Sequence, residues 1–352
     1  MMNLLVYPSS KEVSALARHS EMVKEFDEIT FLVPKGIAQE GVDFALLDGG
    51  HTTGKKISTD LKAKIDTADA ILFPESIRSF SENYIKEIFL ASMQKHKQVF
   101  TEYLPCGIEK NSVFLLGDND ESPNFMTDDG HDNVYGIPIP VIFVLGAGPN
   151  TQKFLVQIAI CDFFERRGYS VSLIGSSRLS KFFGFPSLPN WMYQNGISER
   201  DKIIALNRFF YNQYIISNPD VMIIGIPGGF MPMNPMKYEE MGIWSYLIAN
   251  AVTPDATVFC SYSIDFEPNA IEWQKNICRY KLNSPFKHIA ISNTSINLSL
   301  ESRRYEYGTI PLSSIKSIPL PICEETEFFY SGDDESRRNM GKSLINFLED
   351  NV

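Results

Sequence analysis

A glycine-rich turn with a lysine lies at residues 146–154, which read Gly-Ala-Gly-Pro-Asn-Thr-Gln-Lys-Phe. Five apolar residues, 141–145, precede the turn, and a helical pattern follows over 155–167. A strand, a glycine-rich loop, a lysine and a helix in this order are typical of a phosphate-binding P-loop, in which backbone N–H groups and the lysine hold the phosphates. The sequence therefore predicts an anion site formed by Gly146, Gly148, Asn150, Thr151 and Lys153.

Two residues of this turn depart from the motif. A nine-residue form, Gly-x-Gly-x-x-x-Gly-Lys-Ser/Thr, is found in dethiobiotin-synthetase-like ATPases, and the turn fits it at Gly146, Gly148 and Lys153. Gln152 stands where glycine would let the backbone approach a phosphate closely. Phe154 stands where a hydroxyl would bind magnesium. Because phosphoryl transfer depends on positioning and charge neutralisation, the loss of a metal ligand should strongly reduce hydrolysis.

A second metal-holding position is also missing. In these ATPases an acidic residue ends the equivalent neighbouring strand, and here Gly225 stands near that place in the apolar run 221–226. Gly228 and Gly229 follow, and they either allow the backbone to approach a ligand or form a plain tight turn. We expect an anion-friendly loop without ordinary magnesium-ATP hydrolysis. A retained phosphate or nucleotide site and a structural relic both stay open, with ATP, ADP and CoA as the candidate ligands.

Other candidate residues follow predicted strands. Ser176 and Arg178 come after the strand 170–175 and suit phosphate or carboxylate binding, although a helix-capping role for the serine is an equal alternative. Four more residues are candidates for facing a substrate, with solvated loops as the alternative: Asp48, His51, Glu75 and Asp265. No spacing predicts a metal site. Gly341-Lys342-Ser343 looks like the end of a P-loop, but no strand precedes it, so we expect a helix surface.

Bulk composition narrows the function classes. The chain has 352 residues, which as a soft prior suggests two domains, and 44% of them are hydrophobic. A net charge of −11 argues against nucleic acid as a partner. No segment reaches the ~20 apolar residues that a membrane helix needs. The five cysteines are odd in number and far apart, which favours a reduced, cytoplasmic protein over a disulfide framework or a zinc site.

Strands alternate with helices along the chain, which predicts an α/β fold with parallel sheets. We expect a Rossmann-like parallel-sheet domain over residues 1–110 and an acidic linker over 111–137, which is rich in Asp, Asn, Gly and Pro. The remainder, 138–352, is expected to form an α/β domain of the P-loop NTPase type, similar to dethiobiotin synthetase, with a degenerate P-loop. In such sheets the ligand crevice lies beyond the carboxyl ends of the strands.

An ordered set of short motifs carries a resemblance. The set comprises Tyr7-Pro8, Pro34-Lys35-Gly36, Asp48-Gly49-Gly50, Pro74-Glu75-Ser76, the 146–154 turn with its Lys-Phe ending, residues 173–176, residues 224–229 and residues 251–255. It resembles a clostridial family of peptide maturation system proteins. These are accessory proteins in gene cassettes for ribosomally made, modified peptides, alongside a radical-SAM maturase. The resemblance implies a precursor peptide or a radical-SAM maturase as partner and is compatible with a homo-oligomer.

A more distant resemblance concerns the layout alone. Two-domain proteins with a Rossmann-like first half and a P-loop second half include an acetyl-CoA-dependent D-glutamate N-acetyltransferase. Members of that group usually keep the Gly-Lys-Ser/Thr ending, which this chain lacks, since it has Gln152 and Phe154 on either side of the lysine. This resemblance implies an alternative function, namely an ATP- or acyl-CoA-dependent transferase or ligase that acts at the domain interface.

Overall fold

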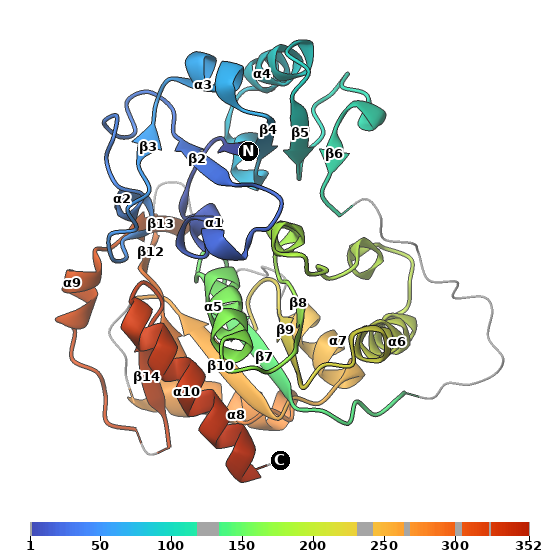
Figure 1. Ribbon diagram of the computed structural model, residues 1–352. Coiled ribbons are helices and arrows are strands. Elements are labelled where there is room, and N and C mark those ends of the chain that lie inside the picture. Colours follow the sequence, from blue (N-terminus) through green and yellow to red (C-terminus); the bar gives the residue numbers. More distant parts are fainter. Residues whose placement is uncertain are drawn as a thin grey trace. The chain divides into compact units, whose positions relative to one another are not determined.

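The structure is a computed structural model that describes residues 2–117, 134–230, 242–263, 268–299, 305–323 and 325–351 (Figure 1). The chain divides into two compact units. The first comprises Met1–Asn119 and Arg178–Gly184, and the second comprises Asp120–Ser177 and Phe185–Val352. Both units are built on a parallel sheet, as the alternation of strands and helices predicts.

The first unit has a Rossmann-like sheet. Its strands are β1 (Asn3–Val6), β2 (Glu28–Leu32), β3 (Ile57–Ser58), β4 (Ala70–Phe73), β5 (Gln98–Thr101) and β6 (Phe114–Leu115). They are all parallel, in the order β3-β2-β1-β4-β5-β6. This is the strand order of the dinucleotide-binding fold, whose ligand crevice lies where the order reverses, beyond β1 and β4.

Short helices connect these strands. They are α1 (Ser14–Arg18), α2 (Ala45–Asp48), α3 (Leu61–Thr67) and α4 (Glu82–Gln94), with 3-10 turns at Lys11–Val13, Ser20–Met22, Glu75–Ser79 and Lys110–Ser112. Asp60 caps α3 by accepting a hydrogen bond from the N–H of Ala63 at 3.2 Å. Apolar side chains of α3 and α4 pack on one face of the sheet, around Ile71 and Phe73.

Two segments of the first unit lie outside the first domain that the sequence predicts. Residues 114–115 fall in the predicted linker 111–137, where the sequence allows one strand over 113–116, and they form the edge strand β6; residues 118–133 lie outside the described residues. The segment 178–184, expected in the second domain, belongs to the first unit. Its Phe182 packs edge-on against Phe100, with ring centroids 5.4 Å apart, and also contacts Phe26.

The second unit has its own parallel sheet. Its strands are β7 (Val141–Gly146), β8 (Val171–Ile174), β9 (Val221–Gly225), β10 (Ala256–Ser261), β11 (His288–Ile291) and β14 (Glu327–Tyr330), in the order β14-β11-β10-β7-β9-β8. An antiparallel pair, β12 (Thr294–Leu298) and β13 (Tyr305–Thr309), stands apart from this sheet. Strand β7 is central, and all of its residues are buried. The loop after β7 therefore emerges at the middle of the sheet's carboxyl edge.

Helices cover both faces of the second sheet. They are α5 (Lys153–Glu165), α6 (Glu199–Ser217), α7 (Ile243–Ala251), α8 (Pro268–Lys281), α9 (Leu312–Lys316) and α10 (Asp334–Asn351), with 3-10 turns at Arg178–Phe183, which belongs to the first unit, and Asn190–Tyr193. Side chains of α6, α7 and α8 pack on the face that carries Phe143 and Leu145. Helix α5 packs against β7, β8, β9 and α10. None of the described helices has the length and apolarity that a membrane crossing requires.

Candidate functional site

The loop between β7 and α5 has a constrained backbone. Asn150 and Gln152 both have positive φ angles, of 60° and 56°, a region that residues other than glycine seldom adopt. Gly146 has no space for a side chain, because an added Cβ would lie 2.5 Å from Oγ1 of Thr151 and 2.8 Å from Cδ of Lys153. Gly146 is therefore required by packing alone, whether or not the loop binds an anion.

Side chains from two neighbouring segments hold the loop in this shape. The hydroxyl of Tyr262, just beyond β10, donates to the carbonyl oxygen of Pro149 at 2.6 Å. The hydroxyl of Thr294, the first residue of β12, donates to the carbonyl oxygen of Asn150, also at 2.6 Å. These bonds fix two successive carbonyl groups, so contacts within the protein hold the backbone of the loop in one conformation.

Lys153 points into the loop, as a phosphate-binding lysine does. Its ammonium group donates to the carbonyl oxygen of Gly148 at 3.2 Å and to that of Gly228, and its residue is 9% exposed. The hydroxyl of Thr151 also donates to the oxygen of Gly148, at 3.1 Å. The structure thus brings four of the predicted residues together from two separate loops. A phosphate that binds here must displace the carbonyl oxygens of Gly148 and Gly228 as hydrogen-bond acceptors of the lysine.

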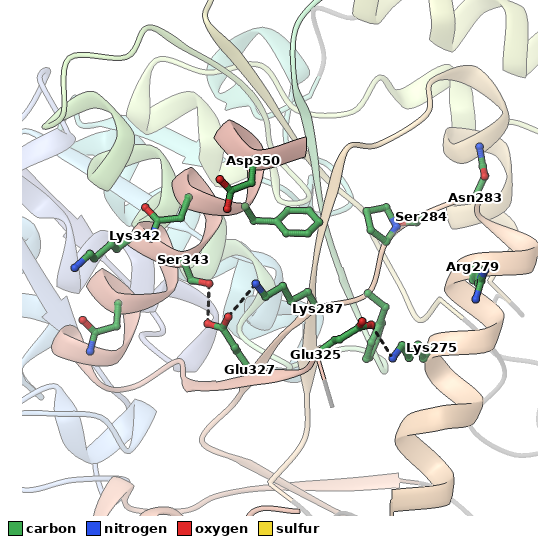
Figure 2. A pocket seen from close by; sticks show the side chains of 15 residues that line it. Lys275, Arg279, Asn283, Ser284, Lys287, Glu325, Glu327, Lys342, Ser343 and Asp350 are labelled. Carbon is green, nitrogen blue, oxygen red and sulfur yellow. Dashed lines mark hydrogen bonds and ion pairs between the residues drawn. The ribbon is translucent and has the colours of Figure 1, made fainter. Parts of the chain in front are cut away.

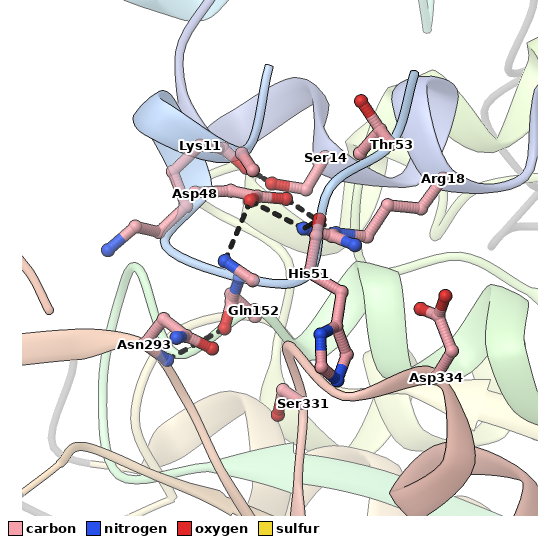
Figure 3. Close-up of polar contacts among 12 residues, drawn as sticks. Lys11, Ser14, Arg18, Asp48, His51, Thr53, Gln152, Asn293, Ser331 and Asp334 are labelled. Atoms are coloured by element: carbon pink, nitrogen blue, oxygen red, sulfur yellow. Dashed lines mark hydrogen bonds and ion pairs between the residues drawn. The ribbon is translucent and has the colours of Figure 1, made fainter. Parts of the chain in front are cut away.

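The two departures from the motif have structural roles. Gln152 is 8% exposed, and its Oε1 accepts a hydrogen bond from the N–H of Asn293 at 2.9 Å (Figure 3). This bond ties the loop to the residue two positions past the end of β11. Phe154 is buried in the first turn of α5. The chain has therefore replaced a close approach to phosphate and a magnesium ligand with an internal hydrogen bond and apolar packing.

A buried glutamine, which is not among the predicted site residues, lies beside Gly225, where P-loop ATPases have an acidic residue that helps to hold magnesium. Gln157, one turn into α5, is fully buried. Its amide donates from Nε2 to the hydroxyl of Ser176 at 2.7 Å and accepts the N–H of Ser176 at Oε1, at 3.0 Å. A Cβ added to Gly225 would lie 2.3 Å from the same amide. A neutral amide therefore occupies the space in which an acidic side chain of β9 would stand.

The remaining predicted site residues of the second unit have varied outcomes. Ser176 uses both of its polar groups on Gln157, so its hydroxyl and N–H are engaged within the fold. Gly229 lies in the loop after β9, next to the Gly228 carbonyl that accepts from Lys153. Asp265 lies outside the described residues.

Four predicted residues belong to the first unit. Arg178 donates to the carbonyl oxygen of Leu116 at 3.4 Å. Asp48 is fully buried and accepts from Nε and Nη2 of Arg18 at 2.6 and 2.7 Å (Figure 3), so it is half of a structural ion pair. His51 is exposed, and its carbonyl oxygen accepts from the same arginine at 3.0 Å.

Glu75, the fourth of these residues, stands beside two carboxyl groups that the sequence reasoning missed. The carboxylate of Glu12 accepts the N–H of Glu75 at 3.2 Å and that of Ser76 at 3.1 Å. Burial raises the pKa of Glu12. Burial and the nearby carboxylates of Glu12 and Glu75 raise the pKa of Glu102 to about 8. Glu12 follows β1, Glu75 follows β4 and Glu102 follows β5, so all three lie at the carboxyl edge of the first sheet. The sequence could group them only once the strand order was known.

Comparisons with known proteins bear on the fold. No family model matches the sequence, and no curated protein does. A DUF1611 family protein from Anabaena variabilis has a similar structure, with a TM-score of 0.56, 10% identity, and coverage of 83% of this chain and 88% of that chain. A GTPase from Pyrococcus abyssi in its apo form gives a TM-score of 0.34 at 12% identity, over 60% of this chain and 97% of that chain. At these identities only the first likeness informs the fold, and it informs nothing else. The chain combines a Rossmann-like unit with a P-loop NTPase-like unit, as the sequence predicts.

Proposed function

We propose that this chain is a non-hydrolysing accessory protein for the maturation of a ribosomally synthesised, post-translationally modified peptide. Its β7–α5 loop holds a phosphate-bearing ligand without ordinary magnesium-ATP hydrolysis. The observation that supports the absence of hydrolysis is the position of Gln157, whose amide lies 2.3 Å from where a Cβ on Gly225 would be.

The chemical argument concerns the metal. A P-loop NTPase holds magnesium with the Ser or Thr hydroxyl that follows its lysine and with an acidic side chain from a neighbouring strand. Here those positions carry Phe154 and Gly225. The space beside Gly225 is taken by an amide that is already hydrogen-bonded to Ser176. Without a metal to bridge the phosphates and neutralise developing charge, the transition state for hydrolysis lacks its main stabilisation.

Anion binding is still compatible with the loop. Helix α5 has 13 residues and directs its amino terminus, the positive end of its dipole, toward the loop. Lys153 adds a full positive charge. The ligand must compete with the carbonyl oxygens of Gly148 and Gly228 for that lysine. We therefore expect weak, metal-independent binding.

The peptide-maturation context rests on the resemblance of the ordered motifs from Tyr7-Pro8 to residues 251–255. The partner that this context implies is the precursor peptide or a radical-SAM maturase. The context is tested by co-expressing the chain with both and looking for a complex. If neither the precursor peptide nor the maturase co-purifies with the chain, the context is contradicted.

The ligand is tested by calorimetry with ATP, ADP and CoA, each with and without Mg²⁺. We expect binding that does not need Mg²⁺, no release of phosphate, and loss of binding in Lys153→Ala. Lys281→Ala, which removes an exposed lysine at the end of α8, is the matched control and should bind as the wild type does. Absence of binding to all three ligands would make the loop a structural relic. Magnesium-dependent hydrolysis or acyl transfer from a CoA thioester would favour the transferase or ligase alternative.

A further inference from the structure

A cavity of about 970 Å³ lies in the second unit, away from the β7–α5 loop. Its walls come from α8, from the segment before β11, from the start of β14 and from α10 (Figure 2). Lys287 precedes β11 and Glu327 begins β14, so the cavity opens at the amino edge of this sheet. The β7–α5 loop follows the carboxyl end of a parallel strand, and the two places are therefore at opposite edges. The volume is at the upper end of the range of roughly 300–1,000 Å³ for small-molecule sites.

Helix α10 presents one face to this cavity. Asn339, Ser343, Asn346 and Asp350 line it at spacings of three and four residues, which places them on one side of a helix. Lys342 lines it as well. The Gly341-Lys342-Ser343 sequence, expected to be plain helix surface, thus contributes two residues to the wall of a cavity.

One wall of the cavity is a fixed polar network (Figure 2). The hydroxyl of Ser343 donates to Oε2 of Glu327 at 2.7 Å, and Nζ of Lys287 lies 3.1 Å from Oε1 of the same carboxylate. Nε2 of His288, a buried residue, is 3.0 Å from the Ser343 hydroxyl. The charges of Lys287 and Glu327 therefore balance each other, and the hydroxyl is held in one orientation.

The charges that remain favour an anion. On the opposite side, Lys275 is 3.7 Å from Glu325, so this pair is also balanced. Within the part of the chain that the structure describes, Arg279 and Lys342 line the cavity without an ion-pair partner, and Asp350 is the one lining carboxylate without one. Two unbalanced cations against one carboxylate give the cavity a net positive charge in a chain whose net charge is −11.

Aromatic side chains supply an apolar surface beside these cations. Phe286 and Phe347 both line the cavity. Nζ of Lys287 lies 5.3 Å from the centre of the Phe347 ring, a cation–π arrangement that holds the ring in place. A ligand that combines a flat apolar group with an anionic group would match this pairing of aromatic rings and cations.

We propose that the cavity between α8 and α10 is a second ligand site, for a small organic anion that carries an aromatic or other planar group. Arg279 and Lys342 take the anionic group, and Phe286 and Phe347 contact the planar part. This site is independent of the β7–α5 loop, because it uses other elements and the opposite edge of the sheet.

The probe is phenyl phosphate, the simplest molecule with both features, and inorganic phosphate and benzyl alcohol carry one feature each. Binding is measured by calorimetry on the full chain. We expect phenyl phosphate to bind more tightly than either fragment. Arg279→Gln and Lys342→Gln should each weaken it about three- to fivefold, the range for a solvent-accessible charge interaction, and added salt should weaken it further.

Matched controls separate this site from general charge effects and from the β7–α5 loop. Lys281→Gln on α8 and Arg338→Gln on α10 remove exposed cations that do not line the cavity, and they should leave binding unchanged. Lys153→Ala should also leave it unchanged. If Lys153→Ala abolishes phenyl phosphate binding while Arg279→Gln does not, the anion binds at the loop and the proposal is wrong. Absence of binding in a folded wild-type chain also overturns it.

Discussion

The packing of Gln157 against Gly225 leads to a quantitative prediction about stability. Gly225→Ala adds a single methyl group whose carbon would lie 2.3 Å from the Gln157 amide, roughly 1 Å closer than ordinary contact, which begins at 3.4 Å. The amide must move, and it then loses the hydrogen bonds of 2.7 and 3.0 Å that it makes to Ser176. We expect the substitution to destabilise the second unit.

The magnitude follows from these contacts. Two hydrogen bonds at about 0.5–1.5 kcal/mol each give about 1–3 kcal/mol, and overpacking of a tight core site costs a similar amount. Gln157→Ala removes the crowding atoms, but it also costs about 1–3 kcal/mol because the half-buried polar groups of Ser176 lose their partner. In that background Gly225→Ala should cost less than about 0.5 kcal/mol. The double-mutant cycle should therefore show a coupling of at least about 1 kcal/mol.

Urea unfolding followed by tryptophan fluorescence measures this cycle. All three tryptophans, Trp191, Trp244 and Trp273, belong to the second unit, so the signal reports that unit alone. Additive effects of the two substitutions, or a neutral Gly225→Ala, would refute the reasoning. They would mean that the space beside Gly225 is open to a side chain, and the main argument against a metal-holding acid there would be lost.

Three further substitutions test other contacts. Asp48→Asn should destabilise the first unit by about 3–5 kcal/mol, because it leaves the Arg18 cation buried without its carboxylate partner, and far-UV circular dichroism on heating would show it. Burial lowers the pKa of His288 from 6.5 to about 4, so between these pH values the unfolded chain binds a proton that the folded chain does not. This titration therefore leaves the free energy of unfolding unchanged above pH 6.5 and lowers it by on the order of 3 kcal/mol as the pH falls toward 4. His288→Gln should remove that part of the pH dependence in urea unfolding. Tyr262→Phe should cost about 1 kcal/mol by leaving the Pro149 oxygen without its donor.

Two of these tests have a matched control variant, and the His288 test has an outcome that would contradict it. Asp66→Asn breaks an exposed pair with Lys95 and should cost less than about 1 kcal/mol, so an equal effect at Asp48 would contradict the buried-pair argument. A wild-type stability that does not change between pH 7 and pH 4.5 would contradict a neutral, buried His288. Tyr280→Phe changes a tyrosine that is 77% exposed, and it should be indistinguishable from the wild type.

The parallel α/β architecture could be predicted because it depends on local patterns. Runs such as 70–73 and 141–145 are continuously apolar, and they became fully buried strands. Residues 11–26, by contrast, have nearly helical spacing of apolar residues, but the α-helix there covers only Ser14–Arg18, with 3-10 turns on each side. Spacing alone does not distinguish a long helix from several short turns that bury the same side chains.

The sequence predicts where the loop of the candidate site lies, but it does not predict which side chains pack and hydrogen-bond around that loop. The positions of Gly146, Gly148 and Lys153 follow from a motif of fixed spacing, and the structure places them in one loop. The role of Gln157 depends on Gly225, which is far away in sequence, so no local pattern reveals it. The one signal was a glutamine in the middle of the apolar run 154–161. A polar residue in a helix that is apolar on all sides must find a buried partner.

The assignment of residues 178–184 to the first unit affects how the chain folds as it is synthesised. The last segment of that unit leaves the ribosome only after residues 120–177, which belong to the second unit. At ~5–20 residues per second, the wait from residue 119 to residue 184 is on the order of 3 to 13 s. Until then Phe26 and Phe100 lack the ring of Phe182. A fragment that ends at residue 119 would keep those aromatic surfaces exposed and should aggregate more readily than the whole chain.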